Sequence, residues 1–237
     1  MKRVLVLKAP GTNNEVETVE AVKMQNCFAE IVHISELLNK EKKLNDYHGL
    51  IIPGGFSYGD NIGAGKVLSF YIEKRLKEEF IKFIEKGKMI LGICNGFQAL
   101  IKSKILPEIT EKQVATLTLN NCGHFVCKWV KLKVLKHPIF KNLPDEIELP
   151  VAHAEGRFVV EKNFKRNIDR YKILLYIENP NGSYKNIAGI TNESKNVIGI
   201  MPHPERCLFP FQNPSSRYNG KIFPWGKIIF KNFVSLL

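Results

Sequence analysis

Residues 89–98 read Met-Ile-Leu-Gly-Ile-Cys-Asn-Gly-Phe-Gln, and this stretch decides the fold. The apolar run that ends at Ile93 is typical of a strand covered on both faces, as in a parallel sheet. Cys94 follows between Gly92 and Gly96, which is the pattern of a nucleophile elbow, a sharp turn from a buried strand into a helix. The turn is too tight for side chains at its flanking positions, so glycines stand there. We therefore expect a strand, a turn with Cys94 at its tip, and a helix.

The position of Cys94 also indicates chemistry. Open α/β sheets bind ligands at the carboxyl ends of their strands, where this cysteine would emerge. The amide groups and the dipole of the following helix favour a thiolate at that point. A buried structural cysteine in a tight turn is the alternative, but strand, elbow and helix together favour a nucleophile.

Apolar strands and helices alternate upstream of this stretch. Strands are expected at residues 3–7, 30–34 and 49–53, and helical spacing covers residues 16–27 and 66–86, the latter as one helix or two. Strands and helices that alternate with short connections are typical of a doubly wound α/β sheet.

Downstream, the pattern changes to short strands separated by turn residues. The strand candidates are residues 114–119, 125–134, 148–152, 158–160, 172–176, 187–191 and 197–201, followed by a closing helix at 227–237. The sequence Asn-Pro-Asn-Gly at 179–182 is a strong turn and indicates a hairpin. We therefore predict an α/β fold with a doubly wound mixed, mostly parallel sheet and antiparallel additions in its C-terminal half. Because no internal repeat or low-complexity linker occurs, a single domain over residues 1–237 is expected.

Composition excludes several classes of protein. Hydrophobic residues make up 44% of the chain and charged residues 24%, as in ordinary soluble globular proteins. No apolar run reaches the length of a membrane span, and the apolar run that follows Met-Lys-Arg is too short for a signal peptide. The 5 cysteines lack the spacing of a disulfide scaffold, which favours a reducing compartment. We expect a cytoplasmic protein.

The net charge of +12 comes mostly from lysines scattered along the chain. Proteins that bind nucleic acid usually gather lysine and arginine on one face, with aromatic side chains among them. The scattered pattern favours a solvated surface and predicts no nucleic-acid partner. Complementarity to an acidic protein partner is the alternative.

Cys122, His124 and Cys127 form a weak zinc pattern, because no second pair of ligands accompanies them. Phe125, Cys127 and Trp129 alternate as one face of a strand does. We therefore predict that this face packs in the core and that the chain has no metal site.

His203 is the histidine best placed to activate a thiolate. It follows the apolar strand at 197–201, so it too would emerge at a strand end. Pro202 and Pro204 bracket it and disfavour a helix. In an extended chain residues two apart point the same way, so Glu205 can reach the imidazole. The two residues supply a base and the group that orients it, which is the logic of a catalytic triad.

Residues 53–60, Pro-Gly-Gly-Phe-Ser-Tyr-Gly-Asp, follow another buried strand. Adjacent glycines let backbone N–H groups approach a substrate closely, as an oxyanion hole requires. We expect the amides of Gly55 and Asn95 to be its donors; a flexible loop with dispensable glycines is the alternative. No phosphate-binding Gly-x4-Gly-Lys-Ser/Thr motif occurs, so an ATP-driven step would take place on another chain.

These residues resemble the class I glutamine amidotransferases, through Gly-Ile-Cys-Asn-Gly at 92–96 with Gln98 and through His-Pro-Glu at 203–205. More narrowly, the chain resembles the PurQ-type glutaminase subunits of phosphoribosylformylglycinamidine synthase. That resemblance rests on Pro-Gly-Thr-Asn at 10–13, the loop at 53–60, Pro-Val-Ala-His-Ala-Glu-Gly-Arg-Phe at 150–158, Asn-Pro-Asn-Gly-Ser at 179–183 and Met-Pro-His-Pro-Glu-Arg at 201–206. These motifs occur in the family's order and span nearly the whole chain.

The resemblance implies a flavodoxin-like fold and assigns roles to several residues. Cys94 would be the nucleophile, with His203 and Glu205 completing the triad. The residues that would hold glutamine or lie near its pocket, or at the synthetase interface, are Gly54, Gly55, Gln98, His153, Gly156 and Arg157.

The resemblance also implies a reaction and partners. Glutamine would be hydrolysed to glutamate and ammonia. The ammonia would pass to a large synthetase subunit, accompanied by a small third subunit, which converts formylglycinamide ribonucleotide to the amidine in purine biosynthesis. No cofactor is expected on this chain, since ATP and Mg²⁺ would be bound by the synthetase.

Two features depart from the family, and two other functions stay open. Ser103 and Lys104 stand where the family has a glycine, and segment 209–226 resembles the family only loosely, as a variable surface loop would.

One alternative function is a glutaminase for a different amination pathway. The other is a nonenzymatic basic binding module, which predicts salt-dependent affinity for nucleic acid.

Overall fold

Strands and helices alternate through the first part of the chain, as the sequence predicts. The computed structural model describes residues 2–214 and 223–237, so residues 215–222 of the loosely matching segment lie outside the described part. The first elements are β1 (Arg3–Lys8), α1 (Glu15–Lys23), β2 (Phe28–His33), α2 (Ile34–Leu38), β3 (Gly49–Ile52), α3 (Lys66–Arg75), α4 (Lys77–Glu85), β4 (Met89–Ile93) and α5 (Asn95–Lys102). The helical stretch at 66–86 is thus two helices, which break at Leu76, where φ is −119° and ψ is 3°.

The second part of the chain consists mainly of strands. They are β5 (Ala115–Thr118), β6 (Val126–Val134), β7 (Glu146–His153), β8 (Arg157–Val160), β9 (Lys172–Tyr176), β10 (Ile187–Thr191) and β11 (Val197–Ile200), and helix α7 (Trp225–Ser235) follows. β9 and β10 pair in antiparallel fashion, which confirms the hairpin expected around residues 179–182. β5 and β8 form a separate two-stranded sheet that the sequence did not predict.

The main sheet has nine strands in the order β2-β1-β3-β4-β11-β10-β9-β6-β7. From β2 to β11 all neighbours are parallel, in the order of a flavodoxin-like doubly wound sheet. β10 and β6 are the two described strands that run against the others. The mixed, mostly parallel sheet with antiparallel additions is confirmed.

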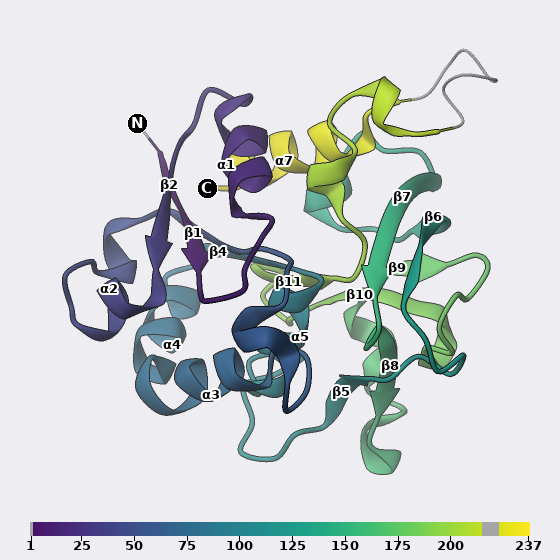
Figure 1. Ribbon diagram of the computed structural model, residues 1–237, viewed down its shortest axis with the longest axis horizontal. Helices are drawn as coiled ribbons and strands as arrows, with labels where there is room; N and C mark the ends of the chain where they lie inside the picture. Colours follow the sequence, from purple (N-terminus) through teal and green to yellow (C-terminus); the bar gives the residue numbers. More distant parts are fainter. Residues whose placement is uncertain (1, 215–222) are drawn as a thin grey trace.

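Helices cover both faces of the parallel half of the sheet. Helices α1 and α7 lie together on one side, and α3, α4 and α5 lie on the other (Figure 1). Every residue of β3, β4 and β11 is buried as a result, which explains why their sequences are apolar without alternation. In the described part of the chain, none of the helices combines the length and the apolar character that crossing a membrane requires.

The prediction that Phe125, Cys127 and Trp129 pack in the core is wrong for Phe125 and Cys127, whereas Trp129 packs against the core from its edge. Cys127 and Cys122 are exposed, Phe125 is 44% exposed, and Trp129 is only partly buried. The buried face of β6 is the opposite one, formed by Val126, Val130 and Leu132. Apolar residues occupy both faces of this strand, so alternation alone could not identify the inner face. Among the described residues, no group of three or more His, Cys, Asp or Glu side chains could hold a metal ion.

Candidate active site

The predicted site residues gather at the carboxyl edge of three neighbouring parallel strands. Gly54 and Gly55 follow β3, Cys94 follows β4, and His203 follows β11. Because β3, β4 and β11 are adjacent in the sheet, the cysteine emerges between the glycines and the histidine. This is the edge at which open α/β sheets bind ligands.

Cys94 occupies the strained turn that the sequence indicates. Its φ is 49° and its ψ is −102°, a conformation that costs a non-glycine residue about 1–3 kcal/mol. The glycines at its flanks are required by packing: a Cβ on Gly92 would lie 2.6 Å from a methyl carbon of Leu100, and one on Gly96 would overlap the carbonyl oxygen of Ile52. Helix α5 begins directly after the cysteine, so the N–H of Asn95 belongs to the first turn, where helices leave donors free.

His203 and Glu205 form a buried pair. Nδ1 of His203 lies 2.6 Å from Oε1 of Glu205, and the two residues are 3% and 1% exposed. The contact is as predicted, but the reason given for it is wrong: Pro204–Arg206 is a turn of 3₁₀ helix, not an extended segment. Proline is tolerated at the first position of a helix, and the short turn still aims Glu205 at the imidazole.

Asn14 belongs to the same buried group, and the sequence reasoning missed it. Its Nδ2 donates to Oε1 of Glu205 at 2.7 Å and lies 3.1 Å from Nδ1 of His203. Nη2 of Arg206 donates to Oδ1 of Asn14 at 2.9 Å, which fixes the orientation of the amide. The available signal was the turn at 10–14, which brings Asn14 from the end of β1 to the same edge of the sheet.

His203 and Glu205 each stabilise the charged form of the other. Burial opposes a charge on the imidazole, but the Glu205 carboxylate and Cys94 outweigh it and raise the pKa of His203. Burial likewise favours the neutral form of Glu205, but His203 and the amide of Asn14 outweigh it and lower the pKa of this carboxyl group. Nε2 of His203 is buried and has no hydrogen-bond partner within the described residues.

Cys94 lies where two cavities meet. One, of about 170 Å³, is lined by Cys94 and His203 together with Asn14 and Phe125. The other, of about 260 Å³, is lined by Cys94 with the loop after β3 and the segment after β7. Both cavities are lined by Gly55, Phe56, Cys94 and Ala152, so the thiol and this glycine belong to the wall of each.

The residues implied by the family resemblance divide into two groups. Gln98 and His153 line the larger cavity, whereas Gly54, Gly156 and Arg157 do not. A Cβ on Gly54 would lie 2.7 Å from Cε1 of His203, and one on Gly156 would overlap the ring of His153. These two glycines therefore leave room for the histidine rings.

His153 is held as a neutral side chain. Burial, followed by the charge of His203, lowers the pKa of His153 to about 4. Its Nδ1 lies 3.1 Å from Oδ1 of Asn120, and its buried Nε2 has no partner in the described part of the chain. Asn120, which also accepts from the N–H of Gly156, is a second residue that the sequence reasoning missed.

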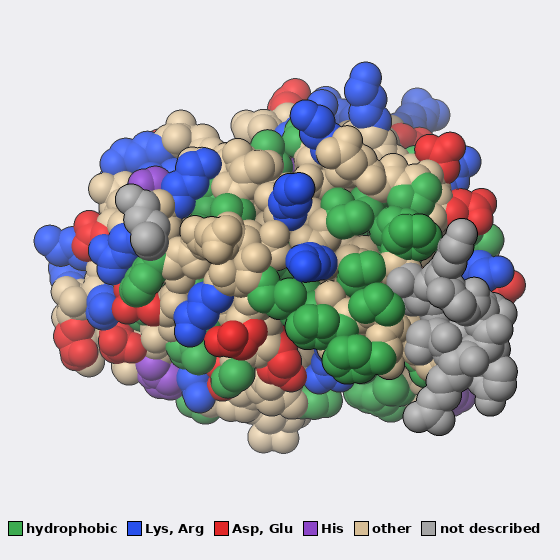
Figure 2. All heavy atoms as spheres, turned by 90° about the horizontal axis from the view of Figure 1, so that it is seen from above, with side chains coloured by type: hydrophobic (Ala, Val, Ile, Leu, Met, Phe, Trp, Pro, Cys, Tyr) green, Lys and Arg blue, Asp and Glu red, His purple; other side chains and the backbone are tan. Residues whose placement is uncertain are grey.

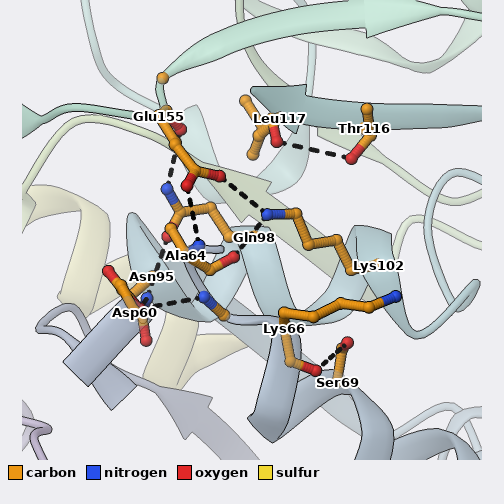
Figure 3. A network of polar contacts seen from close by, with 12 residues as sticks. Asp60, Ala64, Lys66, Ser69, Asn95, Gln98, Lys102, Thr116, Leu117 and Glu155 are labelled. Carbon is orange, nitrogen blue, oxygen red and sulfur yellow. Dashed lines mark hydrogen bonds and ion pairs between the residues drawn. The ribbon is translucent and has the colours of Figure 1, made fainter. Parts of the chain in front are cut away.

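A polar network joins helix α5 to the walls of the larger cavity (Figure 3). Nδ2 of Asn95 donates to Oδ1 of Asp60 at 3.1 Å and to Oε1 of Gln98 at 3.0 Å. Nε2 of Gln98 donates to the carbonyl oxygen of Glu155 at 2.7 Å. The residues after the nucleophile thus fix the positions of both walls of this cavity.

Comparisons with known proteins identify relatives that match nearly the whole chain. The family described as the CobB/CobQ-like glutamine amidotransferase domain matches residues 1–236. Phosphoribosylformylglycinamidine synthase subunit PurQ of Dehalococcoides mccartyi is 40% identical over 230 residues, which cover 90% of this chain and 88% of that protein. The PurQ subunit of Picrophilus torridus is 38% identical, with 94% of this chain and 96% of that protein covered. In the solved structure of PurLQS from Thermotoga maritima, one chain matches with a TM-score of 0.80 and 34% identity, covering 99% of this chain and 98% of that one.

Proposed function

We propose that this chain is the glutaminase subunit of a phosphoribosylformylglycinamidine synthase. The chain belongs to the CobB/CobQ-like glutamine amidotransferase family, and its relatives include PurQ subunits. The observation that carries the proposal is the convergence of Cys94 and the buried His203–Glu205 pair on one cavity. A nucleophile, a base and a group that orients the base are the components of covalent amide hydrolysis.

The proposed reaction begins with attack of the Cys94 thiolate on the side-chain amide carbon of glutamine. A carbon–sulfur bond forms and the carbonyl oxygen becomes an oxyanion. The tetrahedral intermediate collapses by breaking the carbon–nitrogen bond, and imidazolium His203 donates a proton from Nε2 to the leaving ammonia. The imidazole then removes a proton from water, which attacks the glutamyl thioester and releases glutamate and the Cys94 thiolate.

The proposed oxyanion hole consists of the backbone amides of Gly55 and Asn95. Gly55 lines both cavities, and Asn95 is the first residue of helix α5, where N–H groups have no partner within the helix. For glutamine binding, Gln98 and His153 are supported by their place in the larger cavity. Gly54, Gly156 and Arg157 would act on the pocket through their neighbours.

The acceptor of the ammonia would be a synthetase subunit, because the chain of the PurLQS structure that matches this one belongs to a complex. ATP and Mg²⁺ would be bound there and not on this chain. The cysteines at 27, 94, 122, 127 and 207 are all unpaired, which supports a reducing, cytoplasmic environment. Names such as PurQ among the relatives favour purine biosynthesis over another amination pathway.

Trapping of the thioester tests the proposal. With radiolabelled glutamine and the synthetase subunits present, rapid acid quenching in a single turnover should leave label bound to Cys94. Cys94→Ala should remove the label and lower ammonia release at least about 1,000-fold, because it removes the nucleophile.

Cys27→Ala is the matched control, since Cys27 is 5% exposed and Cys94 is 4% exposed, but Cys27 lies outside both cavities. This variant should keep normal activity. Ammonia release from glutamine by Cys94→Ala at the wild-type rate would rule out the mechanism.

A further inference from the structure

The larger cavity beside Cys94 has two carboxylates in its lining, Asp60 and Glu155. The remaining titratable groups of the lining are the thiol of Cys94 and His153, which is neutral near pH 7 because burial lowers its pKa to about 4. The charge that a ligand meets therefore depends on how each carboxylate is compensated.

Glu155 is fully engaged by its neighbours. Its Oε2 lies 3.0 Å from the ammonium of Lys102, a side chain that is only 9% exposed, and its Oε1 accepts from the N–H of Ala64 at 3.0 Å. Lys102 also donates to the carbonyl oxygen of Ala64 at 2.6 Å. The ion pair thus clamps both backbone groups of Ala64 and neutralises the charge of Glu155 (Figure 3).

Asp60 is held in place by uncharged donors. Its Oδ1 accepts from the N–H of Gly65 at 3.2 Å and from Nδ2 of Asn95 at 3.1 Å. Its Oδ2 accepts no hydrogen bond from the described residues. Lys102 is the nearby cation, but its ammonium is bound to Glu155 and Ala64. Among the described residues, Asp60 therefore has no ion-pair partner of its own, and it lines the cavity as a carboxyl group with one oxygen free to accept.

The position of the Asp60 carboxyl group is set by the nucleophile turn. Asn95, which bonds to Asp60, directly follows Cys94 and also bonds to Gln98. Burial, and then the charge of Glu155, raise the pKa of Asp60, whereas the hydrogen bonds to Gly65 and Asn95 and the charge of Lys102 oppose this. A cation bound beside Asp60 would relieve the cost of its charge.

We propose that Asp60 binds the α-ammonium group of glutamine through Oδ2 and is the residue that selects an α-amino acid over a simple amide. This inference rests on the proposed glutaminase function. Glutamine would lie in the larger cavity with its side-chain amide at Cys94 and its α-ammonium group at Asp60.

A comparison of two ligands and two carboxylates tests the proposal. The ligands are glutamine and 4-carbamoylbutyrate, which is glutamine without its α-amino group. Calorimetry would measure their dissociation constants for the full Cys94→Ala chain in the presence of the synthetase subunits, where neither ligand is consumed. We expect glutamine to bind about 10- to 100-fold more tightly, since a hydrogen bond between two charged groups contributes to this extent. Adding Asp60→Asn should bring the ratio of the dissociation constants of 4-carbamoylbutyrate and glutamine close to one.

The ratio of the two dissociation constants distinguishes binding of the α-ammonium group by Asp60 from a merely structural role of this residue. If Asp60 only held Gly65 and Asn95 in place, Asp60→Asn would weaken both ligands equally and leave the ratio unchanged, which would overturn the proposal. Glu155→Gln is the matched carboxylate control and should weaken both ligands to a similar extent through Ala64. A collapse of the ratio in Glu155→Gln and not in Asp60→Asn would also overturn the assignment.

The experiment distinguishes a wrong assignment of Asp60 from a wrong glutaminase function. If the thioester forms on Cys94 but Asp60→Asn leaves the ratio unchanged, then the assignment of Asp60 is wrong and the glutaminase mechanism stands. If neither ligand binds to the Cys94→Ala chain, both the assignment and the glutaminase function are rejected.

Discussion

Asn14 is the residue that connects the start of the chain to the buried charges of the site. Its amide has a single productive orientation, because Arg206 donates to Oδ1 and leaves Nδ2 to donate to Glu205. Glu205 is 1% exposed, so it depends on such donors to remain ionised. Hydrogen bonds to charged groups contribute about 1.5–3 kcal/mol.

We expect Asn14→Ala to lower kcat for glutamine about 10- to 100-fold, because Glu205 loses a donor and orients His203 less well. The same loss moves the pKa of Glu205 upward, so the acidic limb of the activity profile should move to higher pH. Steady-state kinetics as a function of pH measures both effects. Asn39→Ala is the control, since it removes an exposed bond from an amide to Glu41, and it should change kcat less than twofold. Unchanged kcat in Asn14→Ala would show that Glu205 needs no such donor.

The contrast between residues that could and could not be predicted has a physical reason. The sequence identifies Cys94 and Glu205 through their immediate neighbours. The nucleophile elbow around Cys94 and the two-residue spacing from His203 to Glu205 are both local features. Asn14 meets Glu205, and Asn120 meets His153, across 191 and 33 residues of the chain. Such contacts depend on which strand ends become adjacent, and the sequence alone does not fix them.

At the scale of elements, the site depends on how closely helix α5 approaches strand β3. Gly96 lies in the first turn of α5 and faces the carbonyl oxygen of Ile52, with no room for a Cβ. Helix propensity and packing therefore make opposite predictions for Gly96→Ala. Propensity alone would stabilise the protein by about 1 kcal/mol.

We expect packing to dominate, so that Gly96→Ala lowers the free energy of unfolding by about 1–3 kcal/mol as α5 is pushed from the sheet. Urea unfolding followed by circular dichroism measures the change. Gly123→Ala is the control for backbone strain without overlap: an added Cβ there meets nothing within 4 Å, so the cost of about 1–2 kcal/mol comes only from its φ of +75°. A Gly96→Ala protein as stable as the wild type would mean that the helix and strand do not pack as closely as described.

Most elements were predictable because their signals are local. The apolar runs of β3 and β4 and the glycine-flanked elbow are enough to predict the alternation of strands and helices in the first half of the chain. The face of β6 was not predictable, since both of its faces carry apolar residues and only the fold decides which is buried. The pairing of β5 with β8 also depends on long-range contacts, because Ala115 lies opposite Val160.

At the scale of the whole molecule, the distribution of basic side chains can be followed on one face. Figure 2 shows lysine and arginine side chains spread over one face among acidic and uncharged groups. This agrees with the solvated basic surface expected from the scattered lysines. The single domain over residues 1–237 stays a prediction.

Stability of the whole molecule should depend on pH through its buried histidines. His137 lies outside the active-site cavities and is 5% exposed. Its Nδ1 accepts from the N–H of Ile139, so the neutral ring caps a short 3₁₀ helix. Burial, and then the charge of Lys195, lower the pKa of His137 to about 4, whereas the value in an unfolded chain is about 6.5. Between these two values the unfolded state binds more protons, so the free energy of unfolding must fall as the pH falls.

We expect this single histidine to remove about 3 kcal/mol between pH 6.5 and pH 4, with a slope of up to about 1.4 kcal/mol per pH unit. His137→Asn keeps an oxygen that can accept from Ile139 but cannot titrate, so it should reduce the slope by nearly one proton across this range. Urea unfolding at intervals of pH measures the slope for the wild type and for His137→Asn. A slope that His137→Asn does not alter would mean that His137 is protonated as readily in the folded protein as in the unfolded chain, and that burial does not keep this ring neutral.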